Sequence, residues 1–271
     1  SQPTRTNLHA LRNAARKETR ALAEERAKHP FDDIETAPLD YLPKAWSEPY
    51  GTLQDTVYEV YDLQAIRIDG AAEHPTALVQ SAAMASVPPP VPSYRPVLPK
   101  TLVRDGLLSA PQLESVIYAG NAHETHLKGL FKRGEIEGQL IAAAEGDEGA
   151  FRLRKGWFLG DGTGCGKGRQ VAGIILDNWL QGRRRAVWVS KSDKLIEDAR
   201  RDWMALGGRE SDIVPLSKFR QGSDIRLPEG ILFVTYATLR SAEREGKAAR
   251  LEQVTSWLGE GFDGVIAFDE S

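Results

Sequence analysis

A glycine-rich turn between a short apolar run and an amphipathic helix constrains this chain most. The turn reads DGTGCGKG over residues 161–168 and follows the apolar run GWFLG at 156–160. Backbone N–H groups of such a turn, with the positive end of the following helix, hold phosphate oxygens. Gly164 and Gly166 let the backbone approach those oxygens, and Lys167 supplies a charge for the β- and γ-phosphates. The pattern therefore predicts a strand, a phosphate-binding loop and a helix.

The turn departs from the standard phosphate-loop pattern at two positions. Asp161 stands where the pattern has its first glycine, and Gly168 replaces the Ser or Thr that normally binds magnesium. The alternative is a glycine-rich turn without a ligand, although that turn has no structural need for a lysine after G-x-G. We assign Cys165 no chemistry of its own and expect a small apolar filler. The predicted nucleotide-binding residues of the turn are Gly162, Thr163, Gly164, Cys165, Gly166, Lys167, Gly168 and Arg169.

A second chemical signal is the apolar run GVIAF at 264–268, which two carboxylates follow. Ligands of open α/β sheets bind at the carboxyl edge of the strands. There Asp269 is expected to hold Mg²⁺ through water, and Glu270 to orient and polarise the attacking water. A solvated strand end is the alternative, but the phosphate loop upstream favours catalysis. Lys167 and Glu270 are the predicted catalytic residues.

The pattern after residue 107 is that of an α/β fold. Apolar runs alternate with amphipathic helical segments, which predicts a parallel sheet covered by helices on both faces. The predicted strands are 156–160, 186–190, 231–236 and 264–268, and the predicted helices are 108–123, the segment after the glycine-rich turn, and 195–206.

The first hundred residues have an uneven charge distribution. Residues 5–28 are basic and Ala-rich, which predicts a weakly amphipathic helix, either a solvated terminus or an arm for nucleic acid or a partner. The acidic stretch that follows contains a predicted strand or hairpin at 57–68 and a predicted helix at 76–85. Residues 88–99 contain too many prolines for a helix, so an extended connector is expected.

Composition excludes several classes of protein. The single cysteine among 271 residues excludes an internal disulfide framework and a cysteine-based metal site. A formal net charge of −3 gives no evidence for nucleic-acid or membrane binding, so any basic surface is local. No apolar run approaches the ~20 residues that span a bilayer, and no signal-peptide core is found. We expect a cytoplasmic protein of bacterial or mobile-element origin, or a nuclear one if it is eukaryotic.

Four segments together resemble the strawberry notch-type NTPases, a branch of the superfamily 2 helicase-like proteins. These segments are DGTGCGKG, AVWVSKSDKLIEDARRDW, ILFVTYATL and GVIAFDES. The likeness begins at about residue 74, and the family's own phosphate loop also has glycine after the lysine. It implies an α/β fold with a truncated first RecA-like lobe at 101–271. The charge pattern places a basic helical arm at 1–30 and an acidic α/β region, which ends in the proline-rich connector, at 31–100; residues 1 to about 40 lie outside the resemblance.

The resemblance assigns roles residue by residue. Gly164, Gly166 and Lys167 are similar to motif I, and Asp269 and Glu270 to motif II. LSAPQLESV resembles the adenine-recognising Q motif, in which Gln112 would hydrogen-bond to the edge of the base. The same segment is also a capping box, in which the Gln112 side chain bonds to the backbone of Ser109. Members of the family contact the nucleic-acid backbone at positions that correspond to Ser190, Lys191, Thr235 and Tyr236 of this chain. Helix capping is the alternative role for these residues.

The function that the resemblance implies is the ATP-binding first motor lobe of a nucleic-acid-dependent ATPase, with ATP and Mg²⁺ as cofactors. DNA is expected ahead of RNA as the partner. The alternative is a non-motor nucleotide-binding regulatory or scaffold module, and small-molecule phosphotransfer is a weaker third class. In the family a second lobe carries an arginine finger, so this chain alone is expected to bind nucleotide without appreciable hydrolysis.

Overall fold

The computed structural model describes residues 13–20, 27–48, 57–162, 164–240 and 249–269 of this chain. The chain divides into two compact units, Ser1–Glu35 and Thr36–Ser271. Within the first unit, residues 13–20 are helical with exposed side chains, inside the predicted basic helix. The 3₁₀ helix η1 (Pro30–Asp32) follows and buries Phe31.

A four-stranded parallel sheet forms the centre of the second unit. Its strand order is β10 (Ile213–Pro215), β11 (Gly230–Thr235), β9 (Arg185–Ser190) and β12 (Val265–Phe268). Strands β9 and β11 are buried on both faces, as parallel strands between covering layers must be. The sheet confirms the strands predicted near 186–190, 231–236 and 264–268, whereas β10 was not predicted.

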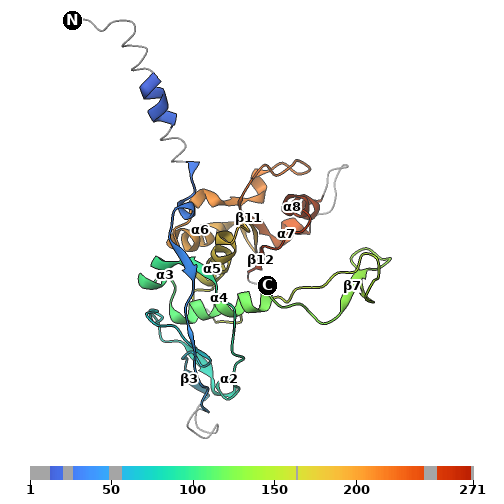
Figure 1. Cartoon of the computed structure of the whole chain (residues 1–271). Coiled ribbons are helices and arrows are strands. Elements are labelled where there is room, and N and C mark those ends of the chain that lie inside the picture. The colour runs from blue at the N-terminus through green and yellow to red at the C-terminus, as the bar shows by residue number, and fades with distance from the viewer. Residues whose placement is uncertain (1–12, 21–26, 49–56, 163, 241–248, 270–271) are drawn as a thin grey trace, which may run out of the picture. The chain divides into compact units, whose positions relative to one another are not determined.

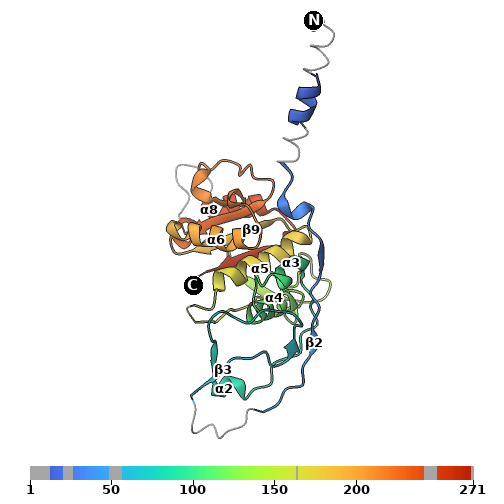
Figure 2. The same cartoon turned by 90° about the vertical axis from the view of Figure 1, so that its left-hand side faces the viewer.

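Helices pack against this sheet as the α/β prediction requires. One face of β9 and β11 forms a cluster with Val254 and Trp257 of α8 (Arg250–Leu258). Helix α5 (Lys167–Leu180) contacts β12 and lies beside α6 (Ile196–Ala205), which contacts β10 (Figure 2). Their buried indoles Trp179 and Trp203 pack 5.5 Å apart between ring centroids. The predicted helices near 108–123, after the turn, and near 195–206 are confirmed.

A further long helix and several short ones accompany these elements. Helix α4 (Ala110–His123) packs against α5, and α7 (Tyr236–Leu239) follows β11 directly (Figure 1). The remaining short helices are α2 (Ala82–Ala85), α3 (Lys100–Arg104), η2 (Asp193–Leu195), η3 (Glu210–Asp212) and η4 (Leu216–Lys218).

The segment before α4 corrects two predictions. The predicted helix at 76–85 is wrong over its first half, where β5 (Val79–Ser81) forms instead. The hydroxyl of Ser81 accepts the N–H of Met84, so the helix α2 begins only at Ala82. Strands β3 (Tyr58–Val60) and β4 (Ile66–Arg67) lie in the predicted strand region but do not form a hairpin. They pair with β5 and β2 (Leu42–Pro43) respectively.

A hairpin lies after α4, and the proline-rich connector contacts the phosphate-loop helix α5. Strands β7 (Leu130–Arg133) and β8 (Leu140–Ala143) pair antiparallel, and this hairpin was not predicted. The connector ends in β6 (Val97–Pro99), which pairs antiparallel with β1 (Thr36–Pro38). Asp177 on α5 holds the connector in place, because its carboxylate accepts hydrogen bonds from Tyr94 Oη at 2.5 Å and Val97 N at 2.6 Å.

We predict that Asp177→Ala lowers the free energy of unfolding by roughly 2–4 kcal/mol, because the hydroxyl of Tyr94 and the N–H of Val97 lose their buried acceptor. Urea denaturation would measure this loss. Asp62→Ala is the matched control, because Asp62 forms an exposed ion pair with Lys44 and should change stability by less than about 1 kcal/mol. Equal effects of the two substitutions would contradict the anchoring role of Asp177.

Candidate functional site

The glycine-rich turn adopts a conformation that requires glycine at two positions. Gly164 has φ 85° and Gly166, the N-cap of α5, has φ 72°, both in the left-handed region. A Cβ on Gly166 would also lie 2.5 Å from Nε2 of Gln112. The turn therefore opens directly onto the N-terminus of α5, where backbone N–H groups and the helix dipole favour an anion.

The segment before the turn corrects the predicted strand at 156–160. Residues 155–162 form no strand, and the Phe158 side chain is 83% exposed. A cavity of about 610 Å³ lies between this segment and β12. β12 pairs only with β9 in the described sheet, so its other edge is free, but the cavity separates that edge from 156–160 and no backbone ladder forms between them. An apolar run alone cannot form a strand without such a partner.

Side chains hold the turn from three directions. The carbonyl oxygen of Cys165 accepts hydrogen bonds from Nε2 of Gln112 at 3.4 Å and Nε2 of Gln170 at 3.1 Å. Gln170 also donates to Oδ2 of Asp161 at 3.1 Å. Lys167 closes the turn by donating from Nζ to the carbonyl oxygen of Asp161 at 2.9 Å. Sequence reasoning missed Gln170, whose only signal is its place one helical turn after Lys167.

Gln112 lies against the turn, as its predicted role requires, and it also forms the capping box. Its Oε1 accepts the N–H of Ser109 at 3.0 Å, and its Nε2 donates to Cys165. Each end of the amide thus already has one partner, which leaves one lone pair and one N–H for a ligand. Adenine recognition by Gln112 stays a prediction.

Asp269 lies at the carboxyl edge of the sheet, directly after β12. Its N–H donates to the carbonyl of Val189 at 2.8 Å, and its Oδ2 accepts from Nε1 of Trp188 at 3.3 Å. The hydroxyl of Tyr236 donates to the Asp269 carbonyl at 3.0 Å. Asp269 and Lys167 line the same cavity. The predicted catalytic Glu270 and the predicted phosphate ligand Thr163 lie outside the described residues.

The predicted nucleic-acid contacts occupy the same edge of the sheet. Ser190 is fully buried, and its Oγ has no hydrogen-bond partner in the described part of the chain. Thr235 is paired in register with Ser190, and its Oγ1 caps α7 by accepting from Thr238 N at 3.2 Å. Lys191 is exposed, and Tyr236 is held by Asp269. The predicted helix-cap role is thus confirmed at Thr235, while nucleic-acid contact by these residues stays a prediction.

Arg169 and Gly168 face the neighbouring helix. Nε of Arg169 lies 3.3 Å from Oδ1 of Asp202 on α6, and its Nη1 donates to the carbonyl of Leu107 at 3.3 Å. A Cβ built on Gly168 would collide with the Asp202 carboxylate. Arg169 therefore connects the start of α5 to α6, and its predicted contact with nucleotide stays a prediction.

The pKa values of two acidic groups near the turn are raised, which favours their neutral forms. Burial, reinforced by the charge of Asp161, raises the pKa of Glu114 on α4 to about 8, against a smaller lowering by Lys44. The hydroxyl of Tyr61 donates to this carboxyl group. Burial also raises the pKa of the Cys165 thiol, so Cys165 is not an activated nucleophile.

We predict that Glu114→Gln stabilises the chain more at pH 8.5 than at pH 5. Below its ordinary pKa of 4.5, Glu114 is protonated in both states; between 4.5 and about 8, only the folded chain keeps the proton. The wild type therefore loses stability as the pH rises through this range, and the neutral glutamine does not. Urea denaturation at both pH values measures the difference. The exposed Glu124→Gln is the control, and a Glu114→Gln effect that is independent of pH would contradict the shift.

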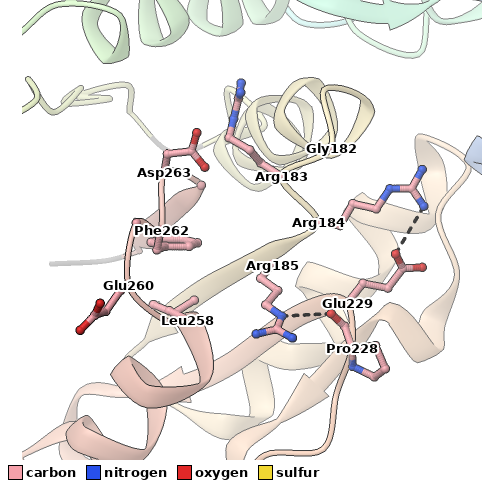
Figure 3. Close-up of a pocket in the computed structure, with 12 residues that line it drawn as sticks. Gly182, Arg183, Arg184, Arg185, Pro228, Glu229, Leu258, Glu260, Phe262 and Asp263 are labelled. Carbon is pink, nitrogen blue, oxygen red and sulfur yellow. Dashed lines mark hydrogen bonds and ion pairs between the residues drawn. The ribbon is translucent and has the colours of Figure 1, made fainter.

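A different pocket, of about 430 Å³, lies at the opposite, amino ends of the strands (Figure 3). Arg183 and Arg184 precede β9 there and Arg185 begins it, but their guanidinium groups are already bound within the protein. Arg184 pairs with Glu229 at 3.4 Å, and Nε of Arg185 donates to the Pro228 carbonyl at 3.0 Å. Arg183 donates to Oδ1 of Asn178 at 2.7 Å. The contacts of Arg184 and Arg185 connect the start of β9 to the segment just before β11. We therefore assign these arginines a structural role.

No group of three or more His, Cys, Asp or Glu side chains comes together as a metal site within the residues that the structure describes. A cation at Asp269 would therefore need further ligands, such as phosphate oxygens. No helix in the described ranges combines the length and the apolar character needed to cross a membrane.

Comparison with known proteins finds a family match over most of the chain. Residues 73–271 match the family described as "P-loop containing NTP hydrolase pore-1". The match includes the glycine-rich turn, the parallel sheet and Asp269. No solved structure matches this chain.

Several curated proteins are similar over the same part of the chain. The strawberry notch homolog 1 of Gallus gallus is 37% identical over 212 residues, which cover 76% of this chain and 15% of that protein. The strawberry notch homolog 2 of Mus musculus is 40% identical over 200 residues, 73% of this chain and 13% of that protein. The FORGETTER 1 protein of Arabidopsis thaliana is 35% identical over 201 residues, 73% of this chain and 14% of that protein. The chain thus spans about one seventh of these relatives.

Proposed function

The chain belongs to the strawberry notch-type P-loop NTPases, and we propose that its nucleotide is ATP, bound with magnesium at the carboxyl edge of the sheet. The observation that carries this proposal is the meeting of Lys167 and Asp269 in one cavity. These residues come from elements about a hundred positions apart in the sequence, and a phosphate loop with an acidic strand end is the pair that nucleotide hydrolysis requires.

The phosphate groups would lie on the turn at residues 164–168. The N-terminus of α5 offers N–H groups at Gly166 and after it, and the glycines leave the backbone accessible. Lys167 now donates to the carbonyl of Asp161, which is a neutral acceptor. A phosphate oxygen is a stronger, charged acceptor, so Lys167 would exchange the carbonyl for the ligand.

Asp269 has the properties of a magnesium ligand. Trp188 orients its carboxylate through Oδ2, and within the described residues no hydrogen bond engages Oδ1. Oxygen donors that leave room for water and phosphate suit magnesium. When bound, magnesium would neutralise charge on the transferring phosphoryl group. Glu270, next in the sequence, would orient the attacking water as a general base.

The second part of the proposal concerns the partner of this ATPase. We propose that the longer protein is a nucleic-acid-dependent ATPase of the helicase-like type, with DNA as its substrate. Ser190 and Thr235 end the adjacent strands β9 and β11, and Lys191 and Tyr236 follow them beside Asp269. Ser190 and Thr235 are buried, so the exposed Lys191 would meet a bound strand first, at a position where that strand would sense the state of the nucleotide. Hydroxyl groups and a lysine at such positions suit backbone phosphates.

We predict that Lys167→Ala weakens ATP binding by about 10- to 100-fold, because one charge-assisted phosphate contact of roughly 1.5–3 kcal/mol is lost. Isothermal titration calorimetry with a non-hydrolysable ATP analogue measures this change. Lys218→Ala is the matched control, since Lys218 is an exposed lysine on η4 and should leave the affinity unchanged. Equal affinities of the wild type and Lys167→Ala would refute the proposed nucleotide site.

We predict that single-stranded or duplex DNA increases ATP hydrolysis in the longer protein that contains this chain. A coupled phosphate-release assay with increasing DNA measures the stimulation. Glu270→Gln should abolish the stimulated turnover while nucleotide affinity stays within about twofold, because Glu270 would act on water rather than on the bound nucleotide. ATP turnover that is indifferent to both DNA and RNA would instead favour a regulatory nucleotide-binding module.

A further inference from the structure

Ser190, at the end of β9, carries a buried hydroxyl group that has no acceptor. The side chain is fully buried, and its Oγ forms no hydrogen bond within the residues that the structure describes. A hydroxyl group that leaves water without gaining a partner is energetically unfavourable. An acceptor that reaches this hydroxyl when a ligand binds nearby would explain why a serine stands at this buried position.

The strand register places Ser190 beside Asp269. Strand β12 runs parallel to β9, and Phe268 is paired with Val189. The N–H of Asp269 donates to the carbonyl of Val189 at 2.8 Å, which continues the ladder past the last residue of β12. The next residues along the two segments are Asp269 and Ser190. They are therefore cross-strand neighbours, on backbones that lie about 4.7–4.9 Å apart.

The side chains of Ser190 and Asp269 also lie on the same face of the sheet. Alternate residues of a strand share a face, so Ser190 shares the face of Trp188, whereas Val187 and Val189 pack on the other face with α8. Nε1 of Trp188 donates to Oδ2 of Asp269 at 3.3 Å, which places the carboxylate on this face too. Trp188 thus bonds to the carboxylate from behind, and Ser190 is the next side chain toward the carboxyl edge.

The neighbour of Ser190 on its other side is already engaged. Thr235 of β11 is paired with Ser190. Oγ1 of Thr235 accepts from the N–H of Thr238 at 3.2 Å and lies 2.8 Å from the Thr238 hydroxyl. Asp269 differs, because no hydrogen bond to its Oδ1 occurs among the described residues. Of the two cross-strand neighbours, Asp269 therefore offers the charged oxygen with open lone pairs.

We propose that Ser190 is a positioning residue for the metal site, whose hydroxyl donates to Oδ1 of Asp269 when this carboxylate binds magnesium. This inference rests on the proposed binding of magnesium and ATP. A carboxylate oxygen has two lone pairs, so Oδ1 can accept from the hydroxyl and still bind the metal. Because Gly168 lacks the hydroxyl that binds magnesium in standard phosphate loops, the site depends more on the orientation of Asp269.

Two other roles for Ser190 make different predictions. A purely structural hydroxyl would stabilise the fold in the absence of nucleotide, so its removal would lower the free energy of unfolding. A direct contact with the nucleic-acid backbone would require Ser190 to become exposed, and its removal would weaken DNA binding. A positioning residue instead affects the part of the nucleotide affinity that magnesium adds.

The experiment measures the affinity of Ser190→Ala for a non-hydrolysable ATP analogue in MgCl₂ and in EDTA by calorimetry. We expect the magnesium-dependent gain in affinity to fall about tenfold, with the affinity in EDTA unchanged. The urea midpoint without nucleotide should stay the same or rise, because the hydroxyl has no partner there. Ser256→Ala, at an exposed serine on α8, is the control and should retain the full magnesium gain.

Mn²⁺ binding to the nucleotide complex, followed by electron paramagnetic resonance, gives a second readout, and Ser190→Ala should weaken it to a similar extent. A full magnesium gain in Ser190→Ala, equal losses of affinity in MgCl₂ and EDTA, or a lower urea midpoint without nucleotide would overturn the inference. Weaker DNA binding with an intact magnesium gain would assign Ser190 to nucleic acid instead. Failure of the wild type to bind the analogue in either buffer would refute the proposed function itself.

Discussion

The pairing of β9 with strands on both of its sides is the constraint on which the rest of the structure depends. Because β11 and β12 both run parallel to β9, the chain leaves all three strands at one edge of the sheet. The register places Thr235 beside Ser190, and the N–H of Asp269 bonds to the carbonyl of Val189. Residues from three separate segments thus meet at this edge, where the side chains of Trp188 and Tyr236 also bond to Asp269. The polar edge next to the phosphate loop is a consequence of strand direction, and these two side-chain bonds hold Asp269 within it.

The phosphate loop depends on a different kind of contact, in which side chains satisfy its backbone. The carbonyl of Cys165 accepts from Gln112 of α4 and from Gln170 of α5, so the loop joins the two helices that pack against each other. Gln112 also completes the capping box at Ser109. The start of α4 and the shape of the loop are therefore coupled through one amide group. A change at this group acts on helix stability and on the loop together.

The sequence was sufficient for features that depend on local pattern, and insufficient for those that depend on a partner. Buried strands such as β9 and β11 were predictable because both of their faces are apolar, and the glycines were predictable because the turn needs left-handed φ. The run at 156–160 has the same apolar pattern, yet it forms no strand, because a cavity separates its backbone from the free edge of β12. The role of Gln170 was equally hidden, because it depends on the path of the turn, which brings the Cys165 carbonyl and the Asp161 carboxylate within its reach.

The balance of charge around the loop explains how two acidic side chains can lie beside an anion site. Asp161 stands at the start of the loop, where a second full negative charge would repel a phosphate group. Its carboxylate accepts a hydrogen bond from Gln170, while its carbonyl accepts from Lys167, so a donor and a cation hold both of its polar groups. Glu114 is buried nearby, and its pKa of about 8 keeps it mostly neutral at pH 7. The charge of Asp161 itself contributes to this shift. The first carboxylate thus helps to keep the second one protonated, which leaves Lys167 and the N-terminus of α5 to set the sign of the potential at the loop.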